Sequence, residues 1–189
     1  TVRDLHAQKA SEKVLMNVLD KIYDYLLSDN ILLYENELFE IIPELKYEKN
    51  FEQRSEWHCF DVWGHTIATI NACDNNVEDR LVMLLHDIGK PFSYQEDGNI
   101  RHFKGHAQKS AEMAKKILDR LNIPEKNKNT IIKLIDMHSK KINIESINAE
   151  NSDFYKRLLK IKICDAKGYE EEHSKIINKE LDKLKKLLK

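Results

Sequence analysis

Residues that form turns are scarce in this chain. Five glycines and three prolines occur among its 189 residues, about 4% of the chain, whereas the two types together make up roughly 12% of an average protein. A many-stranded sandwich or barrel needs more turns than this, and collagen-like or disordered sequence has a different composition. Hydrophobic residues (41%) suffice for a core, and charged residues (33%) for the outer faces of amphipathic helices. The sequence therefore predicts an all-α fold with few, short connections.

Apolar residues recur at helical spacing along most of the chain. We expect helices over residues 11–27, 36–42, 61–73, 77–88, 105–121, 126–138, 154–167 and 170–188. Ser11, Asp61 and Asn75 are the expected N-caps of three of them, and Gly89 followed by Pro91 should end the helix over 77–88. Residues 46–56 lack periodicity and should form a surface loop.

The segment 92–104 differs from the rest because a turn signal, Gln95 to Asn99, stands between short flanks. It should form either an irregular loop or one short hairpin. The length of 189 residues fits one domain of roughly 150 residues with an appended helical piece. We expect residues 1–40 to be an N-terminal helical extension packed on the domain, and residues 41–189 to be the domain, ending in a long C-terminal helix.

Charge and cysteine content exclude several classes of protein. The formal charge is −1, so no overall basic field favours nucleic acid, although the lysines after residue 175 make RNA a weak candidate partner. Cys59, Cys73 and Cys164 are odd in number and lack paired spacing, which argues against a disulfide framework or zinc ribbon. No apolar run approaches the roughly 18 residues of a membrane span, and no leader is recognisable. We expect a cytoplasmic protein without membrane contact.

Charged and imidazole side chains occupy positions where helical spacing calls for core residues. His86, Asp87, His138 and Asp165 each follow an apolar residue by four positions. Burying such a group without a partner costs several kcal/mol. Because separate helices place these groups on core faces, we expect them to meet around a cation.

The residue types limit which cation this is. Imidazoles of His65 and His86 with carboxylates of Asp87 and Asp165 make a mixed nitrogen and oxygen site, which suits manganese, iron, nickel, cobalt or zinc better than calcium; magnesium is a further candidate. One or two ions fit the residues. Such a cation lowers the pKa of a bound water and polarises a phosphoryl oxygen, so hydrolysis of a phosphate ester is the expected reaction class.

The order of these residues resembles a known family. It is the order of the HD-domain superfamily of metal-dependent phosphohydrolases: His65, then His86 and Asp87 within Leu-Leu-His-Asp-Ile-Gly-Lys, then Gly105-His106, His138 and Asp165. The run Trp-His-Cys-Phe-Asp-Val-Trp-Gly-His-Thr over 57–66 is most similar to the C-terminal HD domain of bacterial CCA-adding tRNA nucleotidyltransferases. The similarity covers about residues 41 to 168.

The resemblance implies an all-helical bundle with the metal at its centre. It also implies phosphatase or phosphodiesterase activity on a small phosphate ester such as a nucleotide 2′-phosphate or 2′,3′-cyclic phosphate. By position, the implied metal ligands are His65, His86, Asp87 and Asp165. The implied catalytic residues are Lys90, near the phosphate, and His106 and His138, which match positions that bind a second metal or touch phosphate in other branches. Arg101 and Lys104 are candidate substrate contacts.

Departures from the family narrow the expectation. No Asp-x-Asp occurs, so we expect a stand-alone domain without the nucleotidyl-transfer head. Ser-Lys-Lys follows His138 where cyclic-di-GMP phosphodiesterases carry Gly-Tyr-Pro, and Ile-Gly-Lys-Pro follows Asp87 where guanosine-tetraphosphate hydrolases carry an acidic pair. Both substrates are therefore disfavoured.

Two other functions stay open. The chain could be a metal-bearing module that binds a nucleotide or an RNA end with little turnover, or a relic in which the same residues only hydrogen-bond. Among the remaining ring side chains, we expect His58 to be structural, and we expect exposure of His6 and His173. We place Trp57, Phe60 and Trp63 in the core or in a pocket wall.

Overall fold

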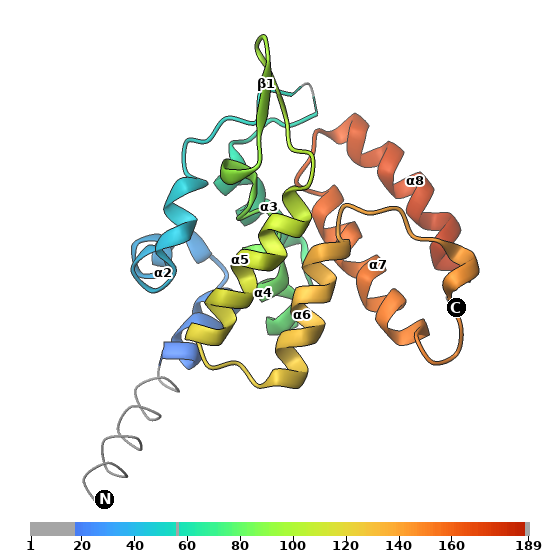
Figure 1. Ribbon diagram of the computed structural model, residues 1–189, viewed down its shortest axis with the longest axis horizontal. Helices are drawn as coiled ribbons and strands as arrows, with labels where there is room; N and C mark the ends of the chain where they lie inside the picture. The colour runs from blue at the N-terminus through green and yellow to red at the C-terminus, as the bar shows by residue number, and fades with distance from the viewer. Residues whose placement is uncertain (1–17, 56, 188–189) are drawn as a thin grey trace, which may run out of the picture.

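Short helices follow one another along nearly the whole chain (Figure 1). The computed structural model describes residues 18–55 and 57–187. Residues 18–27 are helical. The later elements, with 3₁₀ helices written η, are η1 (Ile31–Tyr34), α2 (Glu35–Ile41), η2 (Pro43–Tyr47), α3 (Val62–Ala72), α4 (Val77–Leu85), η3 (Lys90–Phe92), β1 (Gln95–Asp97), β2 (Ile100–His102), α5 (His106–Arg120), α6 (Glu125–Met137), η4 (Ile144–Ser146), α7 (Ser152–Ala166) and α8 (Glu171–Leu187).

The expected all-α fold is confirmed, and the open choice over 92–104 is resolved as a hairpin. β1 and β2 pair antiparallel and project from the top of the bundle in Figure 1. Gly98 makes the turn with a φ of +59°. The beginning of the expected helix over 11–27, with its cap Ser11, lies outside the described residues, and the division at residue 40 stays a prediction. No helix among residues 18–55 and 57–187 has the length and apolarity to cross a membrane.

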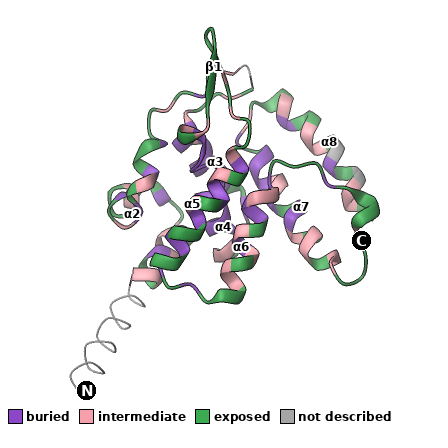
Figure 2. Cartoon of the chain, viewed as in Figure 1, coloured by how far each residue is buried: buried purple, intermediate pink, exposed green. Residues whose placement is uncertain are grey.

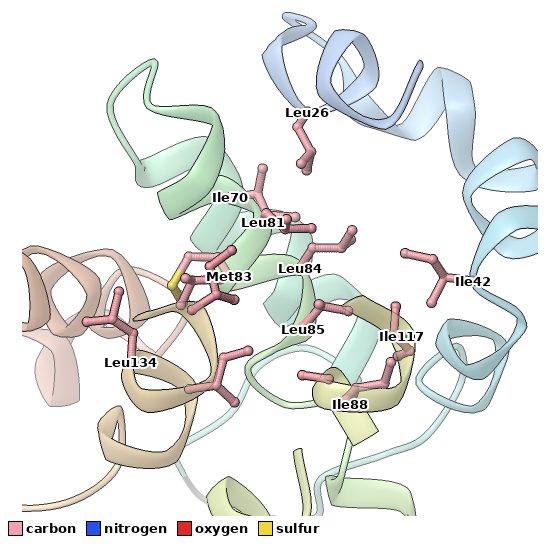
Figure 3. Packing of buried hydrophobic residues seen from close by; sticks show 14 of the residues in the cluster. Leu26, Ile42, Ile70, Leu81, Met83, Leu84, Leu85, Ile88, Ile117 and Leu134 are labelled. Carbon is pink, nitrogen blue, oxygen red and sulfur yellow. The ribbon is translucent and has the colours of Figure 1, made fainter. Parts of the chain in front are cut away.

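Helix α4 forms the centre of the core. Its residues from Leu81 to Leu85 are all fully buried, and it packs against α3, α5, α6 and α7. Figure 3 shows Met83 near Leu134 of α6 and Leu85 near Ile117 of α5. Each such side chain contributes roughly 1.5 to 3 kcal/mol by its burial. Buried residues gather on α4 and on the inner faces of its neighbours (Figure 2), so the residues that follow α4 begin deep inside the molecule.

The two ends of α4 differ from the prediction. Asn76, not Asn75, is its N-cap, because the Asn76 Oδ1 accepts a hydrogen bond from the backbone N–H of Asp79 at 3.0 Å. The helix ends at Leu85 rather than at residue 88. Pro91 lacks an N–H, and its ring would clash with an α-helical carbonyl four residues earlier. The backbone therefore forms 3₁₀-type hydrogen bonds between residues three positions apart. Asp87 lies in the turn after the helix.

The caps of α3 and α5 explain where these helices begin. The Asp61 Oδ1 accepts a hydrogen bond from the backbone N–H of Gly64 at 2.7 Å, so the predicted cap of α3 is confirmed. Gly105 stands before α5 with a φ of +83°, a left-handed conformation that glycine adopts readily. His65 and His106 therefore lie in the first turns of their helices.

The segment 46–56 is not simply a surface loop, so that expectation is wrong. Glu48 and Gln53 are buried, with exposed fractions of 0% and 2%. The Glu48 carboxyl accepts a hydrogen bond from the Thr66 hydroxyl at 2.9 Å, and its Oε1 has no partner. Burial raises the pKa of Glu48 to about 8. Periodicity missed these residues because a segment without regular structure can still bury individual polar side chains.

The raised pKa of Glu48 predicts a pH-dependent stability. Between about pH 4.5 and about pH 8 the folded protein holds a proton on Glu48 that the unfolded chain releases, so the free energy of unfolding falls as pH rises through this window. The loss attributable to Glu48 is at most about 1.4 kcal/mol per pH unit. Glu48→Gln should remove this component. Urea denaturation at about pH 5 and about pH 8 measures it, and the exposed Glu52→Gln is the matched control. Equal pH dependence in wild type and Glu48→Gln would refute the prediction.

Gly89 allows the turn after α4 to contact the backbone of α5. A Cβ at this position would lie 2.5 Å from the Ser110 nitrogen and 2.9 Å from the His106 carbonyl oxygen. The Gly89 N–H also donates to the Ser110 hydroxyl at 2.9 Å. Because the obstructing atoms are backbone, they cannot move without displacing α5.

Gly89→Ala should therefore destabilise the fold by about 2 kcal/mol, the usual scale for overpacking a close contact. Gly98→Ala is the control, since its Cβ meets open space and only its φ of +59° opposes alanine, at a cost of about 1 kcal/mol. Chemical denaturation measures both. If Gly89→Ala lowers the free energy of unfolding no more than Gly98→Ala does, the turn after α4 can shift to accommodate a Cβ, and the prediction is wrong.

Candidate metal centre

Six side chains from five parts of the chain converge at the ends of the central helices. They are His65 on α3, His86 and Asp87 in the turn after α4, His106 at the start of α5, His138 after α6 and Asp165 on α7. All were predicted site residues, and the structure brings all six together.

His65 and His86 turn their free ring nitrogens toward each other. The His65 Nδ1–H donates to the Gly168 carbonyl at 3.0 Å, and the His86 Nδ1–H donates to the Met83 carbonyl at 2.6 Å. The two Nε2 atoms then lie 3.3 Å apart, and the Asp165 Oδ1 lies 3.0 Å and 3.5 Å from them. With each Nδ1–H bonded to a carbonyl, the two Nε2 atoms are left to face each other and Asp165, where they can hold either a proton or a metal ion.

The charged side chains of this cluster also shift one another's pKa values. Burial alone would lower the pKa of His86, but Asp87 and Asp165 overcome it and raise this pKa to about 10. Burial would raise the pKa of Asp165, but hydrogen bonds from His65 and His86 hold it well below its usual value. This cluster therefore attracts positive charge, in the form of a proton or a metal ion.

Asp87 lies between two pairs of imidazoles. Its Oδ2 is 3.4 Å from the His65 Nε2 and 3.2 Å from the His86 Nε2. Its Oδ1 faces the other pair, 3.5 Å from the His106 Nε2 and 3.6 Å from the His138 Nε2, and has no hydrogen-bond partner. Burial would raise the pKa of Asp87, but the charges of His86 and Lys90 keep it well below the usual range. A buried, ionised oxygen without a donor is suited to a cation.

His106 and His138 repeat the arrangement of the first pair. Their Nδ1–H groups donate to the carbonyls of Phe103 at 2.7 Å and Ile135 at 2.6 Å, and their Nε2 atoms lie 3.2 Å apart. Burial lowers the pKa of His106 to about 4, so this ring is neutral near pH 7. The Nε2 of the neutral His106 therefore presents a lone pair on the Oδ1 side of Asp87.

The donor set fits a divalent transition metal. Two overlapping groups bring their ligand atoms within 4.8 Å of one another: His65 with His86 and Asp165, and His86 with Asp87 and His138. Imidazole nitrogens combined with carboxylate oxygens match manganese, iron, nickel, cobalt and zinc. These residues could hold one ion, or two that share Asp87.

Lys90 is buried and pairs with Asp87. Its Nζ lies 2.7 Å from the Asp87 Oδ2, donates to the Gln53 Oε1 at 2.6 Å, and stands 5.4 Å from the centre of the Phe103 ring. Its charge offsets that of the buried carboxylate. Its expected contact with phosphate stays a prediction.

The two predicted substrate contacts, Arg101 and Lys104, lie farther out. The Arg101 guanidinium donates to the Glu52 carbonyl at 2.6 Å and to the Glu96 carboxylate at 3.1 Å, and it stacks over the Phe51 ring. It lines a cavity of about 450 Å³ below the hairpin. Lys104 is exposed. The contacts of Arg101 hold the hairpin against the segment after Glu48, and contact of either residue with substrate stays a prediction.

The ring side chains around the centre agree with the expectations only in part. His58 donates to or accepts from the Ser55 hydroxyl at 2.7 Å, and burial lowers its pKa to about 3, in keeping with a structural role. His173 is half-buried and stacked on Trp57, so its expected exposure is wrong. Trp57 lines the cavity below the hairpin. His6 lies outside the described residues.

Trp63 and Phe60, the other two residues expected in the core or in a pocket wall, differ in their burial. Trp63 is in the core with 4% of its surface exposed, whereas Phe60 is 46% exposed, so its expected burial is wrong. Phe60 stands just before the cap of α3, where the chain is still at the surface. The apolar character of a side chain beside a helix start did not show which way it faces.

Sequence analysis missed Tyr169. Its ring lies 5.2 Å from that of His65, and the nearby Asp165 charge together with burial raises its pKa well above the usual value. Tyr169 follows Asp165 by four positions but lies after the end of α7, so helical spacing did not indicate its position. The buried Glu48 and Gln53 gave no such signal either.

Comparisons with known proteins agree with this geometry. The family model of the HD domain matches residues 62–187, about two thirds of the chain. An A-adding tRNA nucleotidyltransferase of Deinococcus radiodurans is 31% identical over 104 residues, which are 51% of this chain and 24% of that protein. A multifunctional CCA protein of Shewanella frigidimarina is 26% identical over 141 residues, 67% of this chain and 34% of that protein.

A CC-adding tRNA nucleotidyltransferase of Thermus thermophilus is 29% identical over 104 residues, 51% of this chain and 24% of that protein. This chain thus spans between a quarter and about a third of the length of these relatives. The resemblance seen in the residue pattern is confirmed. The chain belongs to the HD-domain family of metal-dependent phosphohydrolases.

Proposed function

We propose that this chain hydrolyses a phosphate ester of a small molecule, a nucleotide 2′-phosphate or 2′,3′-cyclic phosphate being the first candidate. The observation that carries the proposal is the pair of Nε2 atoms of His65 and His86, 3.3 Å apart with both Nδ1–H groups bonded to carbonyls. Two lone pairs at this distance, beside the ionised Asp87 and Asp165, favour a shared cation.

These four residues are the proposed ligands of a divalent transition metal. The carbonyls of Gly168 and Met83 fix each imidazole in the form that binds metal through Nε2. When bound, the ion supplies an acidified water and polarises the phosphoryl group. The identity of the ion and the choice between one and two ions belong to the same proposal.

The remaining side chains of the centre have distinct proposed roles. Lys90 holds the Asp87 carboxylate through a 2.7 Å ion pair and brings a positive charge near the place where phosphate charge develops. His106 is neutral near pH 7 because burial lowers its pKa to about 4, so its Nε2 can accept a proton or orient the substrate. His138 holds its Nε2 3.2 Å from that atom and serves the same side of Asp87.

The first test removes the charge of Asp87. Purified protein with Mn²⁺ or Ni²⁺ should hydrolyse at least one of a 2′,3′-cyclic nucleotide, a 2′-nucleotide and 4-nitrophenyl phosphate. Asp87→Asn keeps the side-chain volume but should lower kcat/KM by on the order of 100-fold or more, because it removes a ligand and the partner of Lys90. Elemental analysis should show a parallel loss of bound metal.

Asp97→Asn is the matched control, since Asp97 is exposed on β1. Turnover that survives Asp87→Asn at the wild-type level would contradict the proposal. Stoichiometric metal with no turnover of any of the three substrates would favour the binding module instead, and absence of metal would favour hydrogen-bonded pairs.

The second test acts through Gly168. A Cβ on Gly168 would lie 2.3 Å from the His65 Nδ1 and 2.9 Å from the Thr69 Cγ2, so alanine must displace the His65 ring from the Gly168 carbonyl. Gly168→Ala should weaken metal binding roughly 10- to 100-fold, the usual effect of losing a bond that orients a ligand. Competition with a chelator measures the affinity, with Gly98→Ala as control. Unchanged affinity in a folded Gly168→Ala protein would remove His65 from the ligand set.

A further inference from the structure

A second hollow opens beside the metal centre, away from the hairpin. It has a volume of about 660 Å³ and lies between the end of α6, the connection that follows it, α7 and α8. In Figure 1 this connection and α8 are on the right-hand side. His138 and Asp165 line it, so the hollow adjoins the proposed reacting position. Its volume is within the range of about 300 to 1,000 Å³ typical of small-molecule sites.

Lys162 gives this hollow a positive charge without a carboxylate partner. It precedes Asp165 by three positions, so both side chains share one face of α7. Its ammonium group donates to the carbonyls of His138 and, at 2.7 Å, Lys140. No carboxylate within the described part of the chain lies within 4 Å of it. An ammonium has three donors, and one of them is left for a ligand.

The surroundings of Lys162 favour an anion over a neutral group. The Lys162 ammonium contacts two carbonyls and no carboxylate among the described residues, so a nearby negative group would stabilise its charge. Lys141 lines the same hollow and is exposed, whereas Lys140 is already paired with Asp136 at 2.6 Å. Asp165 is the one carboxylate among the described lining residues.

Part of the lining of the hollow is apolar. Ile142, from the connection after α6, and Leu181, from α8, are nearly fully buried, and Ile177 and Leu184 extend this part along α8. A purely ionic ligand would gain nothing from these side chains, whereas an aromatic or aliphatic body would. The lining therefore combines a site for an anion with a surface for an apolar group.

We propose that this hollow binds the body of the substrate, and that the substrate is a phosphate ester with an aromatic or apolar body and a second phosphate group, which Lys162 and Lys141 contact. The proposal rests on the function proposed above and specifies its substrate. The reacting phosphate lies at the centre beside Asp165. Lys162 is three positions away, about 4.5 Å along the helix axis, and meets a group that does not react.

The test compares three substrates: adenosine 2′,5′-bisphosphate, adenosine 2′-monophosphate and 4-nitrophenyl phosphate. The wild-type protein should show the lowest KM for the bisphosphate. Lys162→Met should raise this KM about tenfold, the effect of losing one hydrogen bond to a charged group. The KM and kcat for 4-nitrophenyl phosphate should change less than about twofold. Lys160→Met, exposed on the same helix, is the matched control.

Lys162 also braces the end of α6, so a purely structural role must give a different result. Loss of that brace would move His138 and lower kcat for all three substrates alike, and this outcome would overturn the proposal. Ile144→Glu provides a second variant that should fold, because Ile144 is 46% exposed at the hollow. Its added negative charge should raise the KM of the bisphosphate more than that of the monophosphate. Ile176→Glu is its control, at a position 57% exposed on α8 outside the lining.

Failure of this proposal is distinguishable from failure of the proposed function. Turnover of 4-nitrophenyl phosphate with no preference for the bisphosphate over the monophosphate would overturn the pocket assignment alone. If none of the three substrates is turned over, calorimetric titration with adenosine 2′,5′-bisphosphate decides. Binding that Lys162→Met weakens about tenfold would support the pocket, and equal binding by both proteins, or none, would overturn it.

Discussion

The buried charge of Asp87 is the constraint on which the centre depends. Its side chain is 1% exposed and stays ionised, a state that costs several kcal/mol unless positive partners surround it. Lys90 supplies one partner at 2.7 Å, the charge of His86 supplies another, and the Nε2 atoms of four imidazoles lie 3.2 to 3.6 Å from the two carboxylate oxygens. The helices that line the centre contribute at their ends: α3 and α5 in their first turns, α7 in its last turn, and α4 and α6 just after their last turns.

Backbone carbonyls also determine which ring form the histidines adopt. His86, His106 and His138 each donate their Nδ1–H to the carbonyl three residues earlier, at 2.6 to 2.7 Å. The repeated geometry fixes one ring form and aims each Nε2 inward. His65, in the first turn of α3, instead donates to the carbonyl of Gly168, which follows the end of α7. The scarce glycines thus have a structural reason here: Gly168 permits this contact, and Gly89 lets the Asp87 turn reach α5.

The sequence was sufficient for the fold class and for the six residues at the centre. Helical periodicity places His86, Asp87, His138 and Asp165 on core faces, and the order of residues shared with the HD-domain family includes His65 and His106. The sequence was not sufficient where no period exists. Glu48 and Gln53 are buried in an irregular segment, and only the three-dimensional structure shows that Gln53 meets Lys90. The end of α4 was misplaced because the proline effect reaches four residues back, to Asp87. His173 was misjudged because its burial comes from Trp57, more than a hundred positions earlier.

Helix α7 connects the centre to the hollow beside it. Asp165 faces the imidazoles, Lys162 faces the hollow one turn earlier, and Tyr169 follows where the helix has ended. Because Asp165 and Lys162 are fixed on one rigid helix, the spacing between the proposed metal ligand and the proposed anion contact cannot adjust independently. A ligand that satisfies both must match that spacing. In the hairpin, by contrast, the Arg101 guanidinium is already bonded to Glu52 and Glu96. Under the two proposals, selectivity comes from α7 and α8, while the chemistry comes from the helix ends around Asp87.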